Sequence, residues 1–155
     1  MSVVVDGPGG GPFFSVQDLQ VEFRTDDGVV RAVDGVSYSV ERGKTLAVVG
    51  ESGSGKSVTA NAVMGLLDSR QASISGSASL DGEDLVEATP GRLRELRGSR
   101  LSMVFQDPLS SLHPFYTIGR QLVEAVRAKR DINKAEASAR ALQMLERVGI
   151  PNASQ

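Results

Sequence analysis

The chain has 155 residues, of which 40% are hydrophobic and 23% charged, and its formal net charge is -2. This length suits one domain with a real core, and the small net charge excludes a general electrostatic attraction to nucleic acid or anionic lipid. The sequence has no cysteine, which excludes disulfides and thiolate metal sites, and no apolar run approaches the roughly 18 residues of a membrane span, so we expect a soluble chain.

The first half of the chain is expected to form mostly strands. Apolar and polar residues alternate over 19–23 and again over 36–40, which predicts two half-buried strands joined by a turn at 26–28. After a second turn, at 41–43, the apolar run Thr45–Val49 predicts a strand that is buried on both faces, as in the middle of a parallel sheet.

Helices and shorter strands are expected to follow. A helix should run from about Lys56 to Leu67, with four residues on its inner face: Val58, Ala62, Val63 and Leu66. A strand that ends at Leu80 leads into an Asp81-Gly82 turn. Residues 90–97 predict a short helix, and the apolar run 101–105 predicts another buried strand.

The last third of the sequence has a helical pattern. Residues 118–129 predict one helix, and Asn133 with Glu136 resembles the capping pair of a second helix, which Gly149 and Pro151 close. One apolar stripe of this second helix is expected to be partly exposed: Ala135, Ala139, Leu142, Leu145 and Val148.

The stretch VVGESGSGKSVTA, residues 48–60, carries the strongest chemical signal. Gly50, Gly55, Lys56 and Ser57 fit the spacing G-x-x-x-x-G-K-[ST] between an expected strand and an expected helix. Glycines allow a tight turn whose N–H groups point inward, and the positive end of the helix dipole adds to this anion site. We expect Lys56 to reach the β and γ phosphates and the Ser57 hydroxyl to bind Mg²⁺. The expected phosphate contacts are Gly50, Glu51, Ser52, Gly53, Ser54, Gly55, Lys56, Ser57 and Val58.

Two stretches together suggest a family. AVDGVSYSVERGKTLAVVGESGSGKS, followed by VFQDPLSSLHPFYTIGRQL, resembles the ATP-binding subunits of ABC transporters, in the oligopeptide and dipeptide importer branch. The resemblance implies an α/β P-loop NTPase fold, the ABC-type nucleotide-binding domain, with an antiparallel β subdomain, a parallel-sheet core and a helical subdomain.

The same resemblance gives an expected domain layout. After a flexible, glycine-rich leader at 1–12, which lacks the features of a signal peptide, residues 13–155 would be the N-terminal part of the domain. That part comprises a core at 13–106, a Q-loop at 106–119 and an incomplete helical subdomain at 119–150. We find no LSGGQ-like signature and no Walker B strand in the sequence, and expect both to lie downstream of residue 155.

Further site residues are implied by the resemblance. Gln106 would be the Q-loop glutamine, which binds Mg²⁺ or holds the attacking water and so acts with Lys56 in catalysis. Phe23 would stack on the adenine ring, with Tyr38 as the alternative. His113, the one histidine of the sequence, is in the wrong position for the family's switch histidine and is interpreted as a loop residue.

The function implied is ATP binding and hydrolysis that powers the import of a solute, which is expected to be a peptide. The implied partners are membrane-spanning permease subunits, a second ATPase subunit in a head-to-tail dimer and, indirectly, an extracytoplasmic solute-binding protein, at the cytoplasmic face of the membrane. A soluble ABC protein, a kinase or GTPase, and a fragment that binds nucleotide without hydrolysis remain alternatives. No nucleic acid is expected, because the basic run Arg92, Arg94, Arg97 and Arg100 is interpreted as a solvated helix face.

Overall fold

A computed structural model describes residues 2–3, 12–107 and 112–153 of the chain. Most of the expected leader at 1–12 and part of the expected Q-loop at 106–119 lie outside the described residues. The chain divides into two compact units, residues 1–97 and 98–155, and each is described by itself.

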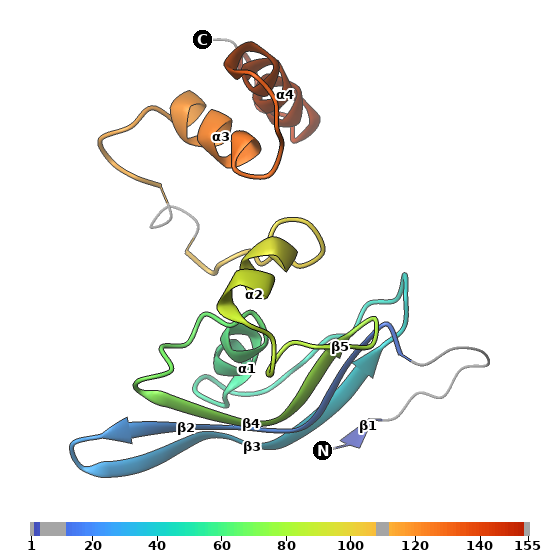
Figure 1. Cartoon of the computed structure of the whole chain (residues 1–155), viewed down its shortest axis with the longest axis vertical. Coiled ribbons are helices and arrows are strands. Elements are labelled where there is room, and N and C mark those ends of the chain that lie inside the picture. The colour runs from blue at the N-terminus through green and yellow to red at the C-terminus, as the bar shows by residue number, and fades with distance from the viewer. Residues whose placement is uncertain (1, 4–11, 108–111, 154–155) are drawn as a thin grey trace. The chain divides into compact units, whose positions relative to one another are not determined.

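The first unit is built on a five-stranded sheet with the order β1-β3-β2-β4-β5 (Figure 1). β1 pairs with β3 in parallel, and every other pair is antiparallel. The alternation over 19–23 and 36–40 is confirmed as two long strands that turn at 26–27. The strands are β1 (Ser2–Val3), β2 (Phe14–Thr25), β3 (Gly28–Val40), β4 (Ala72–Leu80) and β5 (Glu83–Asp84).

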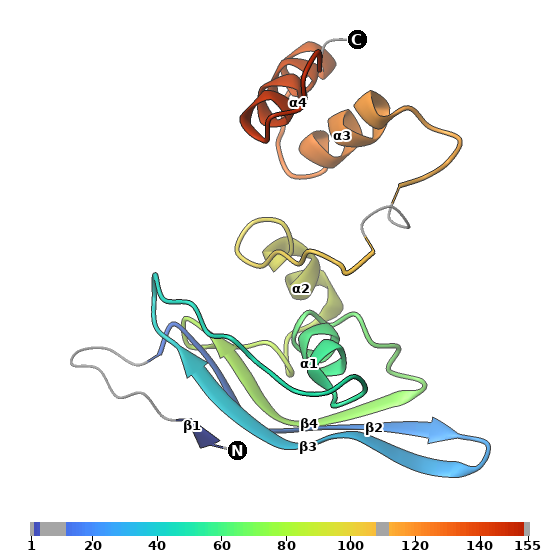
Figure 2. The same ribbon diagram turned by 180° about the vertical axis from the view of Figure 1, so that it is seen from behind.

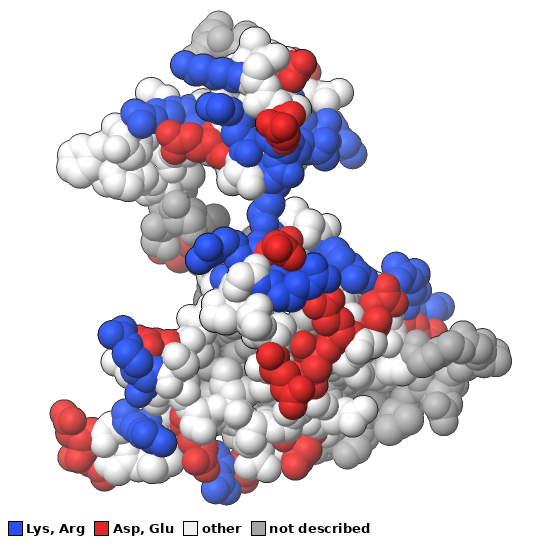
Figure 3. Space-filling view, viewed as in Figure 1, with Lys and Arg blue, Asp and Glu red and all other residues white. Residues whose placement is uncertain are grey.

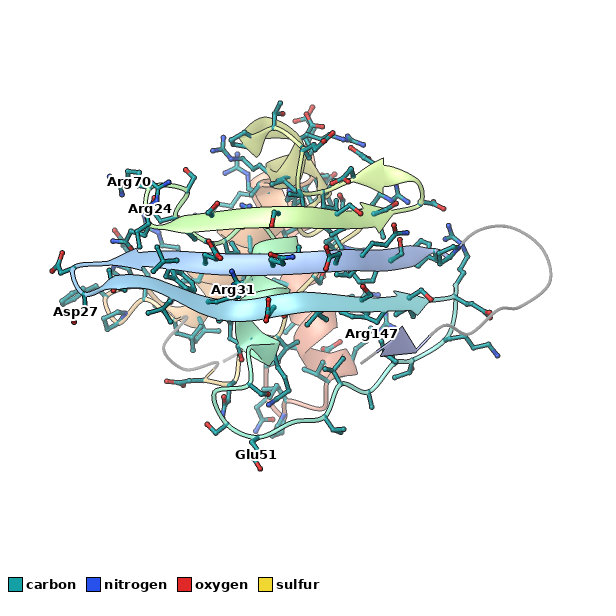
Figure 4. All side chains as sticks on the ribbon, turned by 90° about the horizontal axis from the view of Figure 1, so that it is seen from below. Arg24, Asp27, Arg31, Glu51, Arg70 and Arg147 are labelled. Atoms are coloured by element: carbon teal, nitrogen blue, oxygen red, sulfur yellow. The ribbon has the colours of Figure 1, made fainter. Side chains whose placement is uncertain are left out.

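Two helices lie on one face of this sheet, α1 (Lys56–Val63) and α2 (Pro90–Leu96) (Figure 2). The residues beneath them are almost fully buried and form the core of the unit: Val16, Leu19, Val21, Val33, Ala78 and Leu80. The opposite face is polar, and there Arg31 of β3 makes ion pairs with Glu22 at 3.0 Å and Asp34 at 3.3 Å (Figure 4). The alternation of apolar and polar residues therefore decides which face carries the helices.

α1 is shorter than expected. It ends at Val63, where Met64 caps it and the chain reverses with the Leu66 N–H bonded to Asn61 O. Ala62 and Val63 are buried as predicted, but the prediction for Leu66 is wrong, since it follows the helix and is 42% exposed.

Two expected strands do not form. Residues 44–50 have no strand structure, and Val49 is 88% exposed. In the second unit, residues 102–105 likewise have no strand structure, and Val104 is 91% exposed. Both predictions are wrong for one physical reason: a strand buried on both faces needs neighbouring strands, and the described residues provide none for either segment.

The second unit contains two helices, α3 (Ile118–Arg127) and α4 (Lys134–Arg147). The predicted capping pair is confirmed: the Glu136 N–H donates to Asn133 Oδ1 at 3.0 Å, and the Asn133 N–H donates back to Glu136 Oε2 at 3.3 Å. The apolar stripe is partly exposed, as predicted. Leu142 and Leu145 are half-buried and line a groove with α3, whereas Ala135, Ala139 and Val148 are exposed. The buried residues of α4 are Ala137 and Ala141, which lie outside the stripe.

One arginine of the basic run around α2 is not exposed as predicted. Arg92 is exposed as expected and pairs with Glu83 at 2.6 Å and Glu95 at 2.9 Å, so acidic and basic side chains lie side by side in this region (Figure 3). The interpretation as a solvated face is wrong for Arg97, which is partly buried and bonds to backbone carbonyls next to α1. None of the helices in the described ranges is both long and apolar enough to cross a membrane.

Candidate functional site

The glycine-rich loop is fixed against the sheet at the start of α1. Gly55 caps α1 with a left-handed backbone, φ +86°. A Cβ added at Gly55 would lie 2.5 Å from the carbonyl oxygen of Ala32 and 3.3 Å from Val33 Cγ2, both on β3. The loop can approach the strand this closely only because residue 55 has no side chain, so the motif's second glycine is explained by packing as well as by conformation.

The Lys56 side chain donates hydrogen bonds to three residues of the loop. Its ammonium Nζ donates to Gly50 O at 2.7 Å, to Glu51 O at 2.7 Å and to Ser54 Oγ at 3.1 Å. The Ser54 N–H in turn donates to Glu51 O at 3.2 Å and closes a turn. An ammonium has three donors, so these three acceptors use all of them and place the positive charge at the centre of the loop.

The N-terminal end of α1 has the geometry of an anion-binding site. Gly55 offers no side chain to cap the first turn of α1, and that turn contains no acidic residue. Its N–H groups, with the positive end of the helix dipole, therefore face outward next to the Lys56 ammonium. A Cβ added at Gly53 would meet nothing within 4 Å, and the Ser57 side chain is exposed. A chain of phosphate groups fits this arrangement.

Thr59 is a supporting residue that the motif does not include. It is 7% exposed, and both its N–H (2.8 Å) and its Oγ1 (3.0 Å) donate to the carbonyl oxygen of Gly55. This pair of bonds fixes the carbonyl of the residue at which loop and helix join. A threonine three positions after Lys56 is the only sequence signal for it.

Phe23 lies on the same side of the sheet as the loop. It follows Val21 by two residues, and Val21 is fully buried on the helix-covered face. Val21 is the partner of Val33, against which Gly55 packs. Phe23 is half-buried, opposite Val30, which is 53% exposed. The Phe23 side chain is therefore partly accessible to solvent.

Tyr38 belongs to the other end of the sheet. It pairs with Val16, seven residues before Phe23 on β2, and its ring lies 6.0 Å from that of Phe14. Burial raises the pKa of the Tyr38 phenol. These contacts are those of a packing residue.

Gln106 and His113 lie in the second unit. Gln106 is exposed, and its role at the nucleotide stays a prediction. His113 is part of a local loop structure: its ring lies 4.6 Å from the Tyr116 ring, its Nδ1 accepts from the Phe115 N–H, and its backbone bonds to the Gln121 side chain. This confirms the interpretation of His113 as a loop residue.

The described residues contain no cluster of three or more His, Asp or Glu side chains that could hold a metal. Mg²⁺ commonly keeps several waters and takes phosphate oxygens as ligands, so one exposed hydroxyl such as that of Ser57 fits a metal that arrives with a phosphate chain.

In a comparison with protein families, the model of the ABC transporter family matches residues 33–155. The chain belongs to the ABC transporter family. The match includes the loop, Lys56 and the segment around Gln106, which agrees with the resemblance found in the sequence.

Two relatives show which members of the ABC transporter family this chain resembles. A protein of Brucella abortus (strain 2308), named as a candidate peptide import ATP-binding protein, is 46% identical over 144 residues, which are 93% of this chain and 43% of the relative. The oligopeptide transport ATP-binding protein OppD of Escherichia coli (strain K12) is 44% identical over 139 residues, 90% of this chain and 41% of OppD. The chain thus spans about two fifths of the length of the curated relatives it matches.

The fold is also that of a solved ABC protein. The ATP-binding cassette MJ0796, whose structure is a dimer in a post-hydrolysis state bound to ADP and Pi, superimposes with a TM-score of 0.71. The two chains are 20% identical, and the match covers 86% of this chain and 56% of the other. At this identity the likeness supports the fold class predicted from the sequence.

Proposed function

We propose that this chain carries the ATP-binding site of an ABC import ATPase for peptides. The observation that supports this most directly is the loop itself: the Lys56 ammonium at its centre, the first-turn N–H groups of α1 open beside it, and no acidic residue in that turn. The names of the relatives add the substrate class, since they are peptide and oligopeptide transport ATP-binding proteins.

In this proposal the chain's own residues bind and orient ATP. The amides of the loop and the Lys56 ammonium bind the β and γ phosphates, and Phe23 stacks on the adenine. By the family resemblance, the Ser57 hydroxyl and Gln106 would hold Mg²⁺, which would supply charge neutralisation at the phosphates. Gln106 would also orient the attacking water. Hydrolysis would further need the Walker B and signature segments, which the sequence of this chain lacks.

The expected domain layout and partners are part of the same proposal. Residues 13–155 would be the N-terminal part of the ATPase domain, working with a second ATPase subunit and with permease subunits at the cytoplasmic face of the membrane. A solute-binding protein would act only through the permease. Family membership favours this over a kinase or GTPase. Nucleotide binding without hydrolysis stays the second candidate for these 155 residues, because the sequence lacks those two segments.

The test is a calorimetric titration of the 155-residue chain with ATP and Mg²⁺. We expect saturable binding of ATP, much weaker binding of AMP, which lacks the β and γ phosphates, and competition by inorganic tripolyphosphate for the loop. Equal binding of AMP and ATP would contradict the proposal, because the phosphate loop would then contribute nothing.

Substitutions of Phe23 distinguish the contribution of the base to ATP affinity from the contribution of the phosphates. We expect Phe23→Ala to weaken ATP binding about tenfold, since stacking of a base on an aromatic ring contributes roughly 1 to 3 kcal/mol, and Phe23→Trp to retain it. Tripolyphosphate has no base, so its affinity should not change. Tyr38→Phe is the matched aromatic control. An unchanged ATP affinity in Phe23→Ala would exclude Phe23 as the stacking residue.

A further inference from the structure

The C-terminal end of α1 is held by a side chain that follows α2. Arg97 Nε donates to Met64 O at 2.7 Å, and its Nη2 donates to Gly65 O at 2.6 Å, in a partly buried position. These two carbonyls directly follow Val63, the last residue of α1, where the negative end of the helix dipole lies. The fixed fork of a guanidinium suits two adjacent carbonyls better than a lysine ammonium would.

The turn that Arg97 contacts is in direct contact with α2. Gly65 has a left-handed backbone, φ +61°, and a Cβ added there would lie 2.5 Å from Leu93 Cδ1 and 2.9 Å from Arg97 Nη2. Leu93 and Leu96 of α2 are buried. α2 therefore contacts the turn that follows α1, and the two helices are neighbours in both ribbon views (Figures 1 and 2).

α1 is consequently held at both ends by groups outside it. At the N-terminal end of α1, Gly55 packs closely against Ala32 and Val33. At the C-terminal end, Arg97 donates hydrogen bonds to the two carbonyls that follow the helix. A helix of eight residues is only about 12 Å long, so its two ends are little more than two turns apart. A displacement of the C-terminal end of α1, which Arg97 contacts, would therefore change the direction of the first-turn N–H groups at the expected phosphate site.

We infer that Arg97 is a positioning residue for the phosphate loop, an inference that rests on the proposed function for its purpose. Arg97 fixes the direction of α1 through the carbonyls of Met64 and Gly65, so that the first-turn N–H groups are oriented before a nucleotide arrives. Preorganisation of this kind raises affinity, because binding then needs no further ordering. Arg92 makes contacts of similar number and length, but with the exposed carboxylates of Glu83 and Glu95.

The first test measures amide hydrogen exchange by NMR in the ligand-free chain. Arg97→Met keeps the apolar stem and removes the guanidinium. We expect exchange to become about tenfold faster, equivalent to roughly 1.4 kcal/mol, at both ends of α1. The reporters are the Thr59 N–H, bonded to Gly55 O, and the Met64 N–H, bonded to Ala60 O. Arg92→Met should change neither rate by more than about twofold, and Arg97→Lys should partly restore them.

Two results of the exchange measurement would overturn the inference. Faster exchange at Met64 alone would make Arg97 a local helix cap and would overturn the inference. An equal acceleration throughout the β2–β3 ladder would also overturn it, because a general loss of stability would then explain the effect.

ATP affinity provides the second readout, under conditions in which every variant is folded. We expect Arg97→Met to bind ATP about tenfold more weakly, equivalent to roughly 1.4 kcal/mol, and Arg92→Met to bind like the unmodified chain. Equal ATP affinity in Arg97→Met would contradict the inference. If the unmodified chain failed to bind ATP, the proposed function would fall, while the exchange rates would still decide whether Arg97 positions the loop.

Discussion

Replacing Gly55 with alanine is expected to destabilise the chain and to weaken ATP binding together. A left-handed backbone costs a residue with a Cβ about 1 to 2 kcal/mol. At Gly55 the new Cβ would also lie 2.5 Å from the backbone carbonyl oxygen of Ala32, which cannot rotate away as a side chain can. Either the loop or β3 must move, so the free energy of unfolding should fall by more than the conformational cost alone.

Gly43 is the matched control for this experiment. Its backbone is also left-handed, φ +76°, but a Cβ added there meets nothing within 4 Å, and it lies in the turn before the loop. Gly43→Ala should lose only about 1 to 2 kcal/mol and keep its ATP affinity. Urea unfolding and calorimetry of both variants measure the difference. If Gly55→Ala matched Gly43→Ala in both measurements, the contact with Ala32 would have no role in shaping the loop.

The parts of this fold that the sequence predicted correctly are those formed by neighbours in the chain. The spacing of two glycines and a lysine predicted the loop at 50–55 and the start of α1 at Lys56, where the structure has them. The same holds for the β2–β3 hairpin and for the Asn133 capping pair. In each case, the groups that must meet are separated by few residues or by one turn.

The wrong predictions concern partners that are distant in sequence. The apolar runs Thr45–Val49 and Leu101–Phe105 predicted buried strands, but an apolar run does not specify what buries it. The described residues provide no neighbouring strand, and most side chains of both runs are exposed. Arg97 shows the converse. Nothing in a run of four arginines distinguishes the one that reaches carbonyls 32 and 33 residues earlier in the chain. Its role depends on the packing of α2 on α1, which no local pattern encodes.

Replacing Lys56 with alanine is expected to have the largest effect on nucleotide binding. The variant loses the positive charge at the centre of the loop and all three hydrogen bonds from Nζ. Hydrogen bonds to charged groups contribute roughly 1.5 to 3 kcal/mol each, so the loss of two phosphate contacts should weaken ATP binding by about a hundredfold or more. Lys56→Arg should rescue little, since a planar guanidinium cannot match three convergent acceptors. Lys44→Ala, in the exposed segment before the loop, is the control and should bind normally.

The contacts of Lys56 also indicate how phosphate enters the site. Because all three ammonium donors are used, each phosphate oxygen that binds Nζ must replace one of the present acceptors or share a donor with it. The bond to Ser54 Oγ is the longest, 3.1 Å, and a hydroxyl can rotate away at little cost, whereas the carbonyls of Gly50 and Glu51 are fixed by the backbone. Ser54→Ala should therefore keep its ATP affinity within about threefold, a change of under 1 kcal/mol. Calorimetry on the set Lys56→Ala, Lys44→Ala and Ser54→Ala separates these roles, and full binding by Lys56→Ala would mean that phosphates are held elsewhere.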